Sequence, residues 1–243
     1  MTQQPDVQES YEQSAADWDK TFAAEHLNAR HVQACWRVFQ KVLGSDAGGQ
    51  IAVELGVGTG LFTDRLASRF QRLIAVDFSQ QMLDVLKPKM AQKGIANIDY
   101  VCAPAEALGI IPSGSVDVAF CFGLLENIKD FAPVFREVRR ILKPGGRFAG
   151  VASNGACPWY TLRRRLNPDA WYWQDVHLAT AEELRAAAHA AGLKERVVTG
   201  WGLIPSQLPD SSLLAPIAVV ERVLELSPLK RWMGGLAFRF DAP

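Results

Sequence analysis

The sequence predicts an α/β protein with a doubly wound, mostly parallel sheet. Short apolar runs and helical patterns alternate from residue 51 to residue 150, which is typical of βαβ units. Two of the apolar runs end in an acid, Glu54 and Asp77, and glycines at alternate positions follow the first. A strand that leads through a glycine turn into a helix presents backbone N–H groups to a ligand. We therefore expect a ligand at the carboxyl edge of the sheet.

The composition narrows the class of protein. The chain of 243 residues suits one α/β domain with additions, so we expect a single domain over residues 1–243. The formal net charge is zero, and no apolar run approaches the ~20 residues that span a bilayer. The four cysteines show no paired spacing, and the first residues lack the features of a signal peptide. We expect a cytoplasmic protein with reduced cysteines, no metal site, no nucleic-acid partner and no membrane span, in an oligomeric state that the sequence leaves open.

Two helical patterns precede the first strand. Residues 7–25 carry Tyr11, Ala15 and Trp18 at helical spacing. Residues 31–43 carry a single apolar stripe, which predicts a helix packed on the core.

The first strand leads into a glycine loop. Gly56, Gly58 and Gly60 follow Glu54 in the pattern E-x-G-x-G-x-G, and a helical pattern continues over residues 62–70. Because glycine has no Cβ, the backbone can take positive φ and a ligand can lie directly on it. Dinucleotide-binding folds use G-x-G-x-x-G instead, so the spacing disfavours a nicotinamide dehydrogenase. An ordinary glycine turn between strand and helix remains the alternative.

The second strand, residues 72–77, ends in Asp77 about twenty residues beyond the first glycine. An acid at this place can accept hydrogen bonds from the ribose hydroxyls of a nucleoside. Ser79 is expected to begin the next helix as its N-cap. The second acid therefore strengthens the case for a bound nucleoside.

The remaining core elements continue the alternation. Residues 101–108 follow a third strand, and residues 115–122 form the fourth. A helix over residues 135–142 stops at the P-G-G of residues 144–146 and leads into a fifth strand.

These motifs resemble those of the class I S-adenosylmethionine-dependent methyltransferases. The glycine loop resembles the first motif of the family, and residues 137–146 resemble the E-x-x-R-x-L-x-P-G-G signature of its ubiquinone and menaquinone branch. The resemblance implies a Rossmann-like methyltransferase fold: a seven-stranded sheet with an antiparallel last strand, an N-terminal helical lid within residues 1–48 and a cap after strand five. Residues 194–203 and 235–240 fit the last two strands.

The resemblance also implies S-adenosylmethionine as the cofactor. In the family, the acid of the first motif supports the loop and the methionine ammonium group, and the second acid holds the ribose. The cofactor-binding residues implied in this chain are Tyr11, Glu54, Gly56, Gly58, Gly60, Asp77, Phe78, Met82, Ala105, Glu106 and Phe122. Core packing is the alternative for Phe78 and Met82. Pro104 stands where many relatives carry an acid, so the backbone N–H of Ala105 is the expected contact to adenine.

The cofactor-binding core is expected to cover residues 49–152. Two segments that follow it, residues 153–180 and 205–233, are expected to cap the acceptor side. The first contains an aromatic block that predicts an apolar cleft: Trp159, Tyr160, Trp171, Tyr172 and Trp173. Thr180 with Glu183 predicts a capping box at the start of a helix. An apolar, helix-like stretch covers residues 213–226.

The candidate catalytic residues are His177 and Glu126. His177 follows the aromatic block, and Glu126 follows the fourth strand at the edge where doubly wound folds bind ligands. Methyl transfer depends mainly on alignment and exclusion of water, but a general base assists it. A histidine that only fixes the loop is an equal alternative for His177. We expect His189 on the surface and favour a solvated helix face, over contact with an anionic acceptor, for the arginines of residues 163–165.

The predicted function is methyl transfer from S-adenosylmethionine to a small aromatic or apolar acceptor. The chain lacks the N/D-P-P-Y/F and Pro-Cys motifs of enzymes that methylate nucleic-acid bases. The alternative is a protein that binds S-adenosylmethionine or S-adenosylhomocysteine without transferring a methyl group. The sequence leaves open the acceptor and the atom that is methylated.

Overall fold

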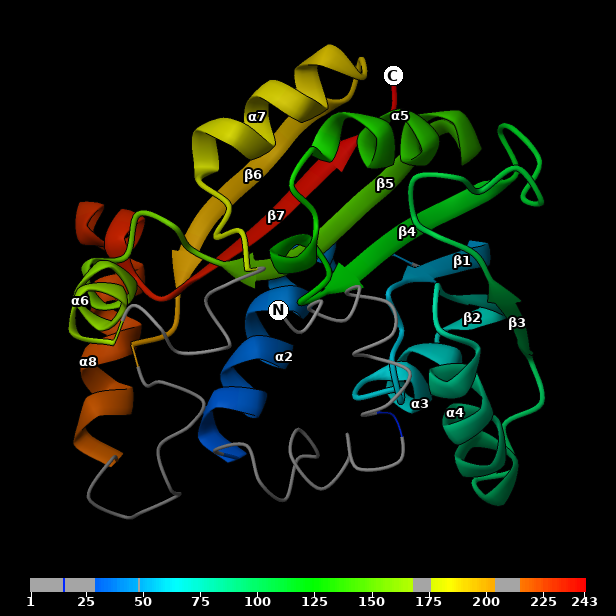
Figure 1. Ribbon diagram of the computed structural model, residues 1–243, viewed down its shortest axis with the longest axis horizontal. Helices are drawn as coiled ribbons and strands as arrows, with labels where there is room; N and C mark the ends of the chain where they lie inside the picture. Colours follow the sequence, from blue (N-terminus) through cyan, green and yellow to red (C-terminus); the bar gives the residue numbers. More distant parts are fainter. Residues whose placement is uncertain (1–14, 16–28, 48, 168–175, 204–214) are drawn as a thin grey trace, which may run out of the picture.

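A seven-stranded sheet forms the centre of the molecule, in the strand order β3-β2-β1-β4-β5-β7-β6 (Figure 1). The structure is a computed structural model that describes residues 15, 29–47, 49–167, 176–203 and 215–243. The strands are β1 (Gly49–Leu55), β2 (Phe70–Asp77), β3 (Ile98–Cys102), β4 (Val116–Phe122), β5 (Leu142–Ser153), β6 (Lys194–Trp201) and β7 (Gly235–Asp241). The predicted fold class is confirmed.

The pairing of the strands agrees with a mostly parallel sheet that has an antiparallel last strand. β1 lies between β2 and β4 and is parallel to both, and β3 and β5 extend the parallel region on either side. β7 runs antiparallel to both β5 and β6. Because parallel strands end at the same edge, the loops after β1, β2 and β4 meet at the carboxyl edge of the sheet.

Helices cover both faces of the sheet, with α5 and α7 on one side and α2, α3 and α4 on the other (Figure 1). The helical elements are α2 (Ala29–Leu43), α3 (Thr63–Ala67), α4 (Gln80–Gln92), α5 (Phe131–Ile141), α6 (Pro158–Leu166), α7 (Ala181–Ala190) and α8 (Ala215–Glu225), with short 3-10 turns η1 (Leu125–Asn127) and η4 (Pro228–Trp232). Strand residues alternate between the two cores: Val53 and Leu55 pack under α5, whereas Ala52 packs with α2. The apolar stripe predicted for residues 31–43 is the buried face of α2.

The helix after the glycine loop is shorter than the sequence pattern predicts. Phe70, which continues the helical spacing, instead opens β2 and pairs with Gly49. The side-chain amide of Asn97 donates hydrogen bonds to the carbonyl oxygens of Ala67 and Phe70, at 2.8 and 2.9 Å. These bonds occupy acceptors that a longer helix would use, so α3 ends at Ala67.

β2, α8 and β7 lie within two residues of their predicted spans, but α5 begins at Phe131, before the predicted residue 135. The prediction that the P-G-G of residues 144–146 separates helix from strand is wrong. Leu142 already takes an extended conformation, so α5 ends at Ile141, β5 begins at Leu142, and the P-G-G lies inside β5, where the pairing with β4 shifts register. The capping box of Thr180 and Glu183 is present at the start of α7. Cys102 is exposed at the end of β3 rather than in the core, although all four cysteines are free as expected. Among the described helices none is long and apolar enough to cross a membrane.

Candidate active site

The three glycines of the loop after β1 all take left-handed backbone conformations, with φ of 64° at Gly56, 53° at Gly58 and 85° at Gly60. A Cβ built at Gly56 would lie 2.8 Å from a methyl carbon of Leu124, and one built at Gly60 would lie 2.3 Å from a methyl carbon of Leu86. A side chain at either position would have to displace a leucine, and the positive φ favours glycine in addition. A Cβ built at Gly58 meets no atom of the described residues within 4 Å. Among the three glycines, only Gly58 faces open space in the part of the chain that the structure describes.

Asp77, at the end of β2, lies directly against this position. The N–H of Gly58 donates to its Oδ2 at 2.8 Å, and the N–H of Ser79 donates to its Oδ1 at 2.9 Å. The side chain is 4% exposed, and this burial raises the pKa of its carboxyl group above the usual range. A carboxylate offers about four lone pairs, so after the backbone bonds it still has capacity to accept ligand hydroxyls. Asp77 thus joins the glycine loop to the end of β2.

Glu54 lies beneath the loop and is 3% exposed. The hydroxyl of Thr63 donates to its Oε2 at 2.8 Å. Desolvation by burial raises the pKa of the Glu54 carboxyl to about 8, and the negative charges of Asp64 and Asp77 raise it further. Two buried acids below one loop make the site favour a cation.

The other residues predicted for the cofactor differ in exposure. Ala105 is buried, Glu106 is exposed, and Phe78 at the end of β2 is half-buried. Met82 is 1% exposed, which agrees with the packing interpretation of this residue. Tyr11 lies outside the described residues.

Phe122 belongs to an aromatic cluster under the loop. Its ring centroid lies 4.5 Å from that of Phe39 on α2 and 4.7 Å from that of Phe62. Phe122 is half-buried, so it supports the loop from below while part of the ring stays accessible. This packing gives Phe122 a structural role, whether or not it also contacts a ligand.

Glu126 lies in η1, directly after β4. Its Oε1 accepts a hydrogen bond from the N–H of Ser153 at 2.6 Å, while its buried Oε2 has no hydrogen-bond partner among the described residues. Burial raises the pKa of the Glu126 carboxyl. Tyr160 on α6 forms a side-chain hydrogen bond with Ser153, and burial raises the pKa of the Tyr160 hydroxyl. Glu126, Ser153 and Tyr160 therefore form one half-buried polar cluster.

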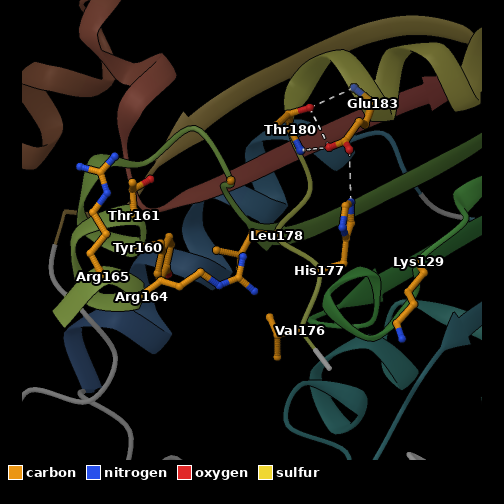
Figure 2. Close-up of a pocket in the computed structure, with 11 residues that line it drawn as sticks. Lys129, Tyr160, Thr161, Arg164, Arg165, Val176, His177, Leu178, Thr180 and Glu183 are labelled. Atoms are coloured by element: carbon orange, nitrogen blue, oxygen red, sulfur yellow. Dashed lines mark hydrogen bonds and ion pairs between the residues drawn. The ribbon is translucent and has the colours of Figure 1, made fainter. Parts of the chain in front are cut away.

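A cavity of about 770 Å³ opens beside this cluster (Figure 2). Its described lining combines residues of the segment after η1, of α6 and of the approach to α7: Lys129, Gly155, Tyr160, Thr161, Arg164, Arg165, Val176, His177, Leu178, Thr180 and Glu183. The lining is more cationic than the apolar cleft that the aromatic block predicts. Tyr160 lines the cavity, whereas Trp159 does not and is 47% exposed. Trp171, Tyr172 and Trp173 lie outside the described residues.

His177 is held at the rim of the cavity by two contacts. Its backbone N–H donates to the carbonyl oxygen of Glu126 at 2.8 Å, and its Nε2 lies 3.3 Å from Oε1 of Glu183. Figure 2 shows the ring pointing towards Glu183, which also forms the capping box with Thr180. These contacts fix the loop that contains His177. They also orient its imidazole at the edge of the cavity, so they agree with both predicted roles of this residue. His189 is exposed on α7, as expected.

The glycine loop and the cavity adjoin through the segment after β4. Leu124 packs against Gly56, Glu126 accepts the hydrogen bond of His177, and Lys129 lines the cavity. Sequence reasoning missed Lys129 and Ser153, because no local motif marks them. It favoured a solvated helix face for Arg164, which is exposed on α6 and also lines the cavity. No group of three or more His, Cys, Asp or Glu residues in the described chain is arranged to hold a metal.

Comparison with known proteins supports the resemblance to methyltransferases that the sequence motifs indicate. Residues 53–150 match a methyltransferase domain family. The chain is 32% identical over 151 residues to the demethylmenaquinone methyltransferase of Lactococcus lactis, covering 61% of this chain and 58% of that protein. It is 28% identical over 160 residues to a ubiquinone biosynthesis O-methyltransferase of Acinetobacter baylyi, covering 63% and 66%. This chain therefore spans about three fifths of the length of these relatives.

A solved structure extends the similarity of fold to nearly the whole chain. An S-adenosylmethionine-dependent methyltransferase of Thermotoga maritima superimposes with a TM-score of 0.66 at 19% identity, covering 96% of this chain and 98% of that one. Identity this low shows the fold alone. Residues 53–150 are therefore similar to a methyltransferase domain, in a chain that has the fold of the solved S-adenosylmethionine-dependent methyltransferase and is similar in sequence to ubiquinone and menaquinone enzymes.

Proposed function

We propose that this protein transfers the methyl group of S-adenosylmethionine to a small aromatic or apolar acceptor. The observation that carries the proposal is the junction of Gly58 and Asp77, where an open left-handed glycine and a buried carboxylate lie 2.8 Å apart, N to Oδ2. A nucleoside with a cationic tail matches that junction, because Asp77 offers hydroxyl acceptors and Glu54 lies below the same loop.

The residues of this side fit the cofactor in distinct ways. Asp77 would accept the ribose hydroxyls, and Gly58 would allow the ligand to lie against its backbone. Glu54 would stabilise the methionine ammonium group, and binding of a cation would lower the raised pKa of Glu54. Ala105, buried after β3, would offer its backbone N–H to the adenine.

The acceptor is proposed to lie on the other side of the segment after β4. When bound, S-adenosylmethionine supplies a methyl carbon that forms a bond with an acceptor lone pair, while the carbon–sulfur electrons stay on sulfur and the acceptor's proton passes to a base. His177 at the cavity rim is the candidate base, and Glu183 would orient its imidazole. Glu126 is the second candidate, because its Oε2 is buried and unpaired among the described residues.

The named activities of the relatives agree with an acceptor of this class. They are called a demethylmenaquinone methyltransferase and a ubiquinone biosynthesis O-methyltransferase. The domain match ends at residue 150, before α6 and the cavity residues that follow it. The similarity therefore supports the cofactor more strongly than the acceptor.

Calorimetry followed by a transfer assay tests the proposal. The wild-type protein should bind S-adenosylmethionine, and incubation of methyl-labelled S-adenosylmethionine with an extract of the source organism should give a labelled small molecule that mass spectrometry identifies. Asp77→Ala should lose both signals, while Asp99→Ala, at an exposed acid of the neighbouring β3, should keep both. Binding without any labelled product would favour the non-transferring alternative, and no binding would contradict the proposal.

A further inference from the structure

We propose that the cavity beside η1 binds an anionic group, and that this group is a carboxylate or phosphate carried by the methyl acceptor. The second half of this inference rests on the proposed function. The first half concerns the cavity alone and is tested separately below.

Basic side chains reach the cavity from three separate segments. Lys129 comes from the turn before α5, Arg164 and Arg165 from α6, and His177 from the approach to α7. In Figure 2, Arg164 extends from α6 past Tyr160 towards His177, whereas Arg165 points away from it. Lys129 lies on the opposite side of His177 from Arg164 in the same view. Tertiary packing thus places Lys129, Arg164 and His177 around one space, although the first two lie 35 positions apart in the sequence.

The described lining contains fewer acids than bases. Glu183 is the single acid in the described lining, and its Oε2 accepts from the N–H and the hydroxyl of Thr180, at 2.7 and 2.8 Å. Its Oε1 lies 3.3 Å from Nε2 of His177. Lys129 forms no ion pair with any acid in the described part of the chain. The described lining thus has a positive formal charge, with Lys129, Arg164 and Arg165 against the single acid Glu183.

This arrangement suits a ligand with several anionic oxygens. A guanidinium group presents paired N–H donors that match a carboxylate or phosphate, and Lys129 adds a point charge from another direction. The hydroxyl of Thr161 and the ring of Tyr160 belong to the same lining, so an anionic end and an aromatic or apolar body can be held together. Water screens exposed cations, so the anion contributes orientation more than tight binding.

The location connects the anion to the proposed reaction. The cavity reaches the segment after β4 through Lys129 and through the bond of His177 to Glu126. The same segment packs on the glycine loop, because Leu124 lies against Gly56. An anionic group in the cavity would therefore hold the rest of the acceptor next to the cofactor loop, as an orienting contact requires.

Inorganic phosphate tests the anion site without reference to methyl transfer. Phosphate should raise the melting temperature of the wild-type protein relative to chloride at equal ionic strength, and should show broadened phosphorus resonances. The double variant Lys129→Gln/Arg164→Gln should weaken phosphate binding by about ten-fold or more. Arg163→Gln is a matched control, because it removes a charge from the same helix at a residue outside the cavity lining. No effect on the wild-type protein, or an equal loss in the control, would overturn the proposal.

A labelling arm distinguishes an acceptor from a free anion. Labelled product from the transfer assay should bind an anion-exchange resin at neutral pH. Labelling by the double variant should fall by about ten-fold while calorimetry gives an unchanged affinity for S-adenosylmethionine. Phosphate binding with an uncharged product would overturn the acceptor half of the proposal and indicate a free anion. If the wild-type protein binds no S-adenosylmethionine, the proposed function fails, and the phosphate titration alone decides whether the anion site exists.

Discussion

The two halves of the carboxyl edge differ in the charge and burial of their side chains. On the side of β1 and β2, two buried acids, Glu54 and Asp77, are fixed by hydrogen bonds from Thr63 and from backbone N–H groups. On the side of β4 and α6, basic side chains outnumber the one acid in the described cavity lining, and Lys129 and Arg164 are exposed there. The first half suits a cationic nucleoside, and the second suits an anion.

The difference also concerns rigidity. Buried groups with several hydrogen bonds hold one geometry, whereas long exposed side chains lose conformational entropy when a ligand orders them. Substitutions in the first half should therefore change cofactor affinity strongly, and substitutions in the second should change acceptor use while leaving cofactor affinity intact. The predictions below separate these two outcomes.

The largest effect is expected at Gly58. Gly58→Val places a branched side chain where the cofactor is proposed to lie, so the affinity for S-adenosylmethionine should fall by more than about 100-fold in calorimetry. Gly94→Val is a matched control, because Gly94 also has positive φ, 69°, and no described atom near a built Cβ. Both variants should lose about 1–2 kcal/mol of stability from backbone strain. Wild-type affinity in Gly58→Val would remove the loop from the site.

The next largest effect is expected on kcat when His177 is replaced, in the half of the edge where the acceptor is proposed to bind. His177→Ala should lower kcat by about 100-fold and remove the acidic limb of its pH profile, because a protonated imidazole cannot act as a base. The affinity for S-adenosylmethionine should not change. His189→Ala, at an exposed histidine of α7, should behave as wild type. Normal kcat and pH profile in His177→Ala would reduce His177 to the anchor that its contact with Glu183 already provides.

Asp77→Ala should weaken S-adenosylmethionine binding by about ten- to hundred-fold, since hydrogen bonds to a charged acceptor contribute ~1.5–3 kcal/mol. The substitution also leaves the N–H groups of Gly58 and Ser79 without their acceptor, so the melting temperature should drop. Asp77→Asn keeps one acceptor oxygen and should be milder in both measurements. Unchanged calorimetric affinity in Asp77→Ala would exclude this carboxylate from the site.

The smallest expected effect is on stability, and it tests the protonation of the buried Glu54 carboxyl group as pH changes. Its pKa is raised from 4.5 to about 8 in the folded state. The folded protein therefore holds this proton more tightly than the unfolded chain, and stability should fall as pH rises from about 4.5 to about 8. Glu54→Gln removes this dependence, so relative to wild type it should gain stability between pH 5.5 and pH 8.5 in urea unfolding. If the difference in free energy of unfolding between the two proteins did not change with pH, the pKa of Glu54 would not be raised in the folded state.

The cofactor half was predictable because its signals are local. The glycine loop, Asp77 and the Ser79 cap lie within single βα units, so short patterns in the sequence specify them. Packing contributes what the pattern cannot show. The structure shows that Gly56 and Gly60 lie against leucine side chains whereas Gly58 does not, and that Asn97 ends α3 early.

The acceptor half was less predictable because its contacts join distant parts of the chain. His177 and Glu126 were identified by position, but their backbone bond depends on the approach to α7 folding back onto η1. Arg164 meets Lys129 only when α6 and the turn before α5 border one cavity. A charge run in a sequence does not reveal which of its members line a cavity.

Hydrogen–deuterium exchange with each ligand alone tests the division most directly. S-adenosylmethionine should slow exchange in peptides covering residues 54–62 and 76–82 and leave residues 155–165 unchanged. Inorganic phosphate should slow exchange in residues 126–131 and 155–165 and leave the glycine loop unchanged. Protection of residues 54–62 by S-adenosylmethionine is the result that the account predicts. Protection of the cavity peptides alone, or of no peptide at all, would contradict it.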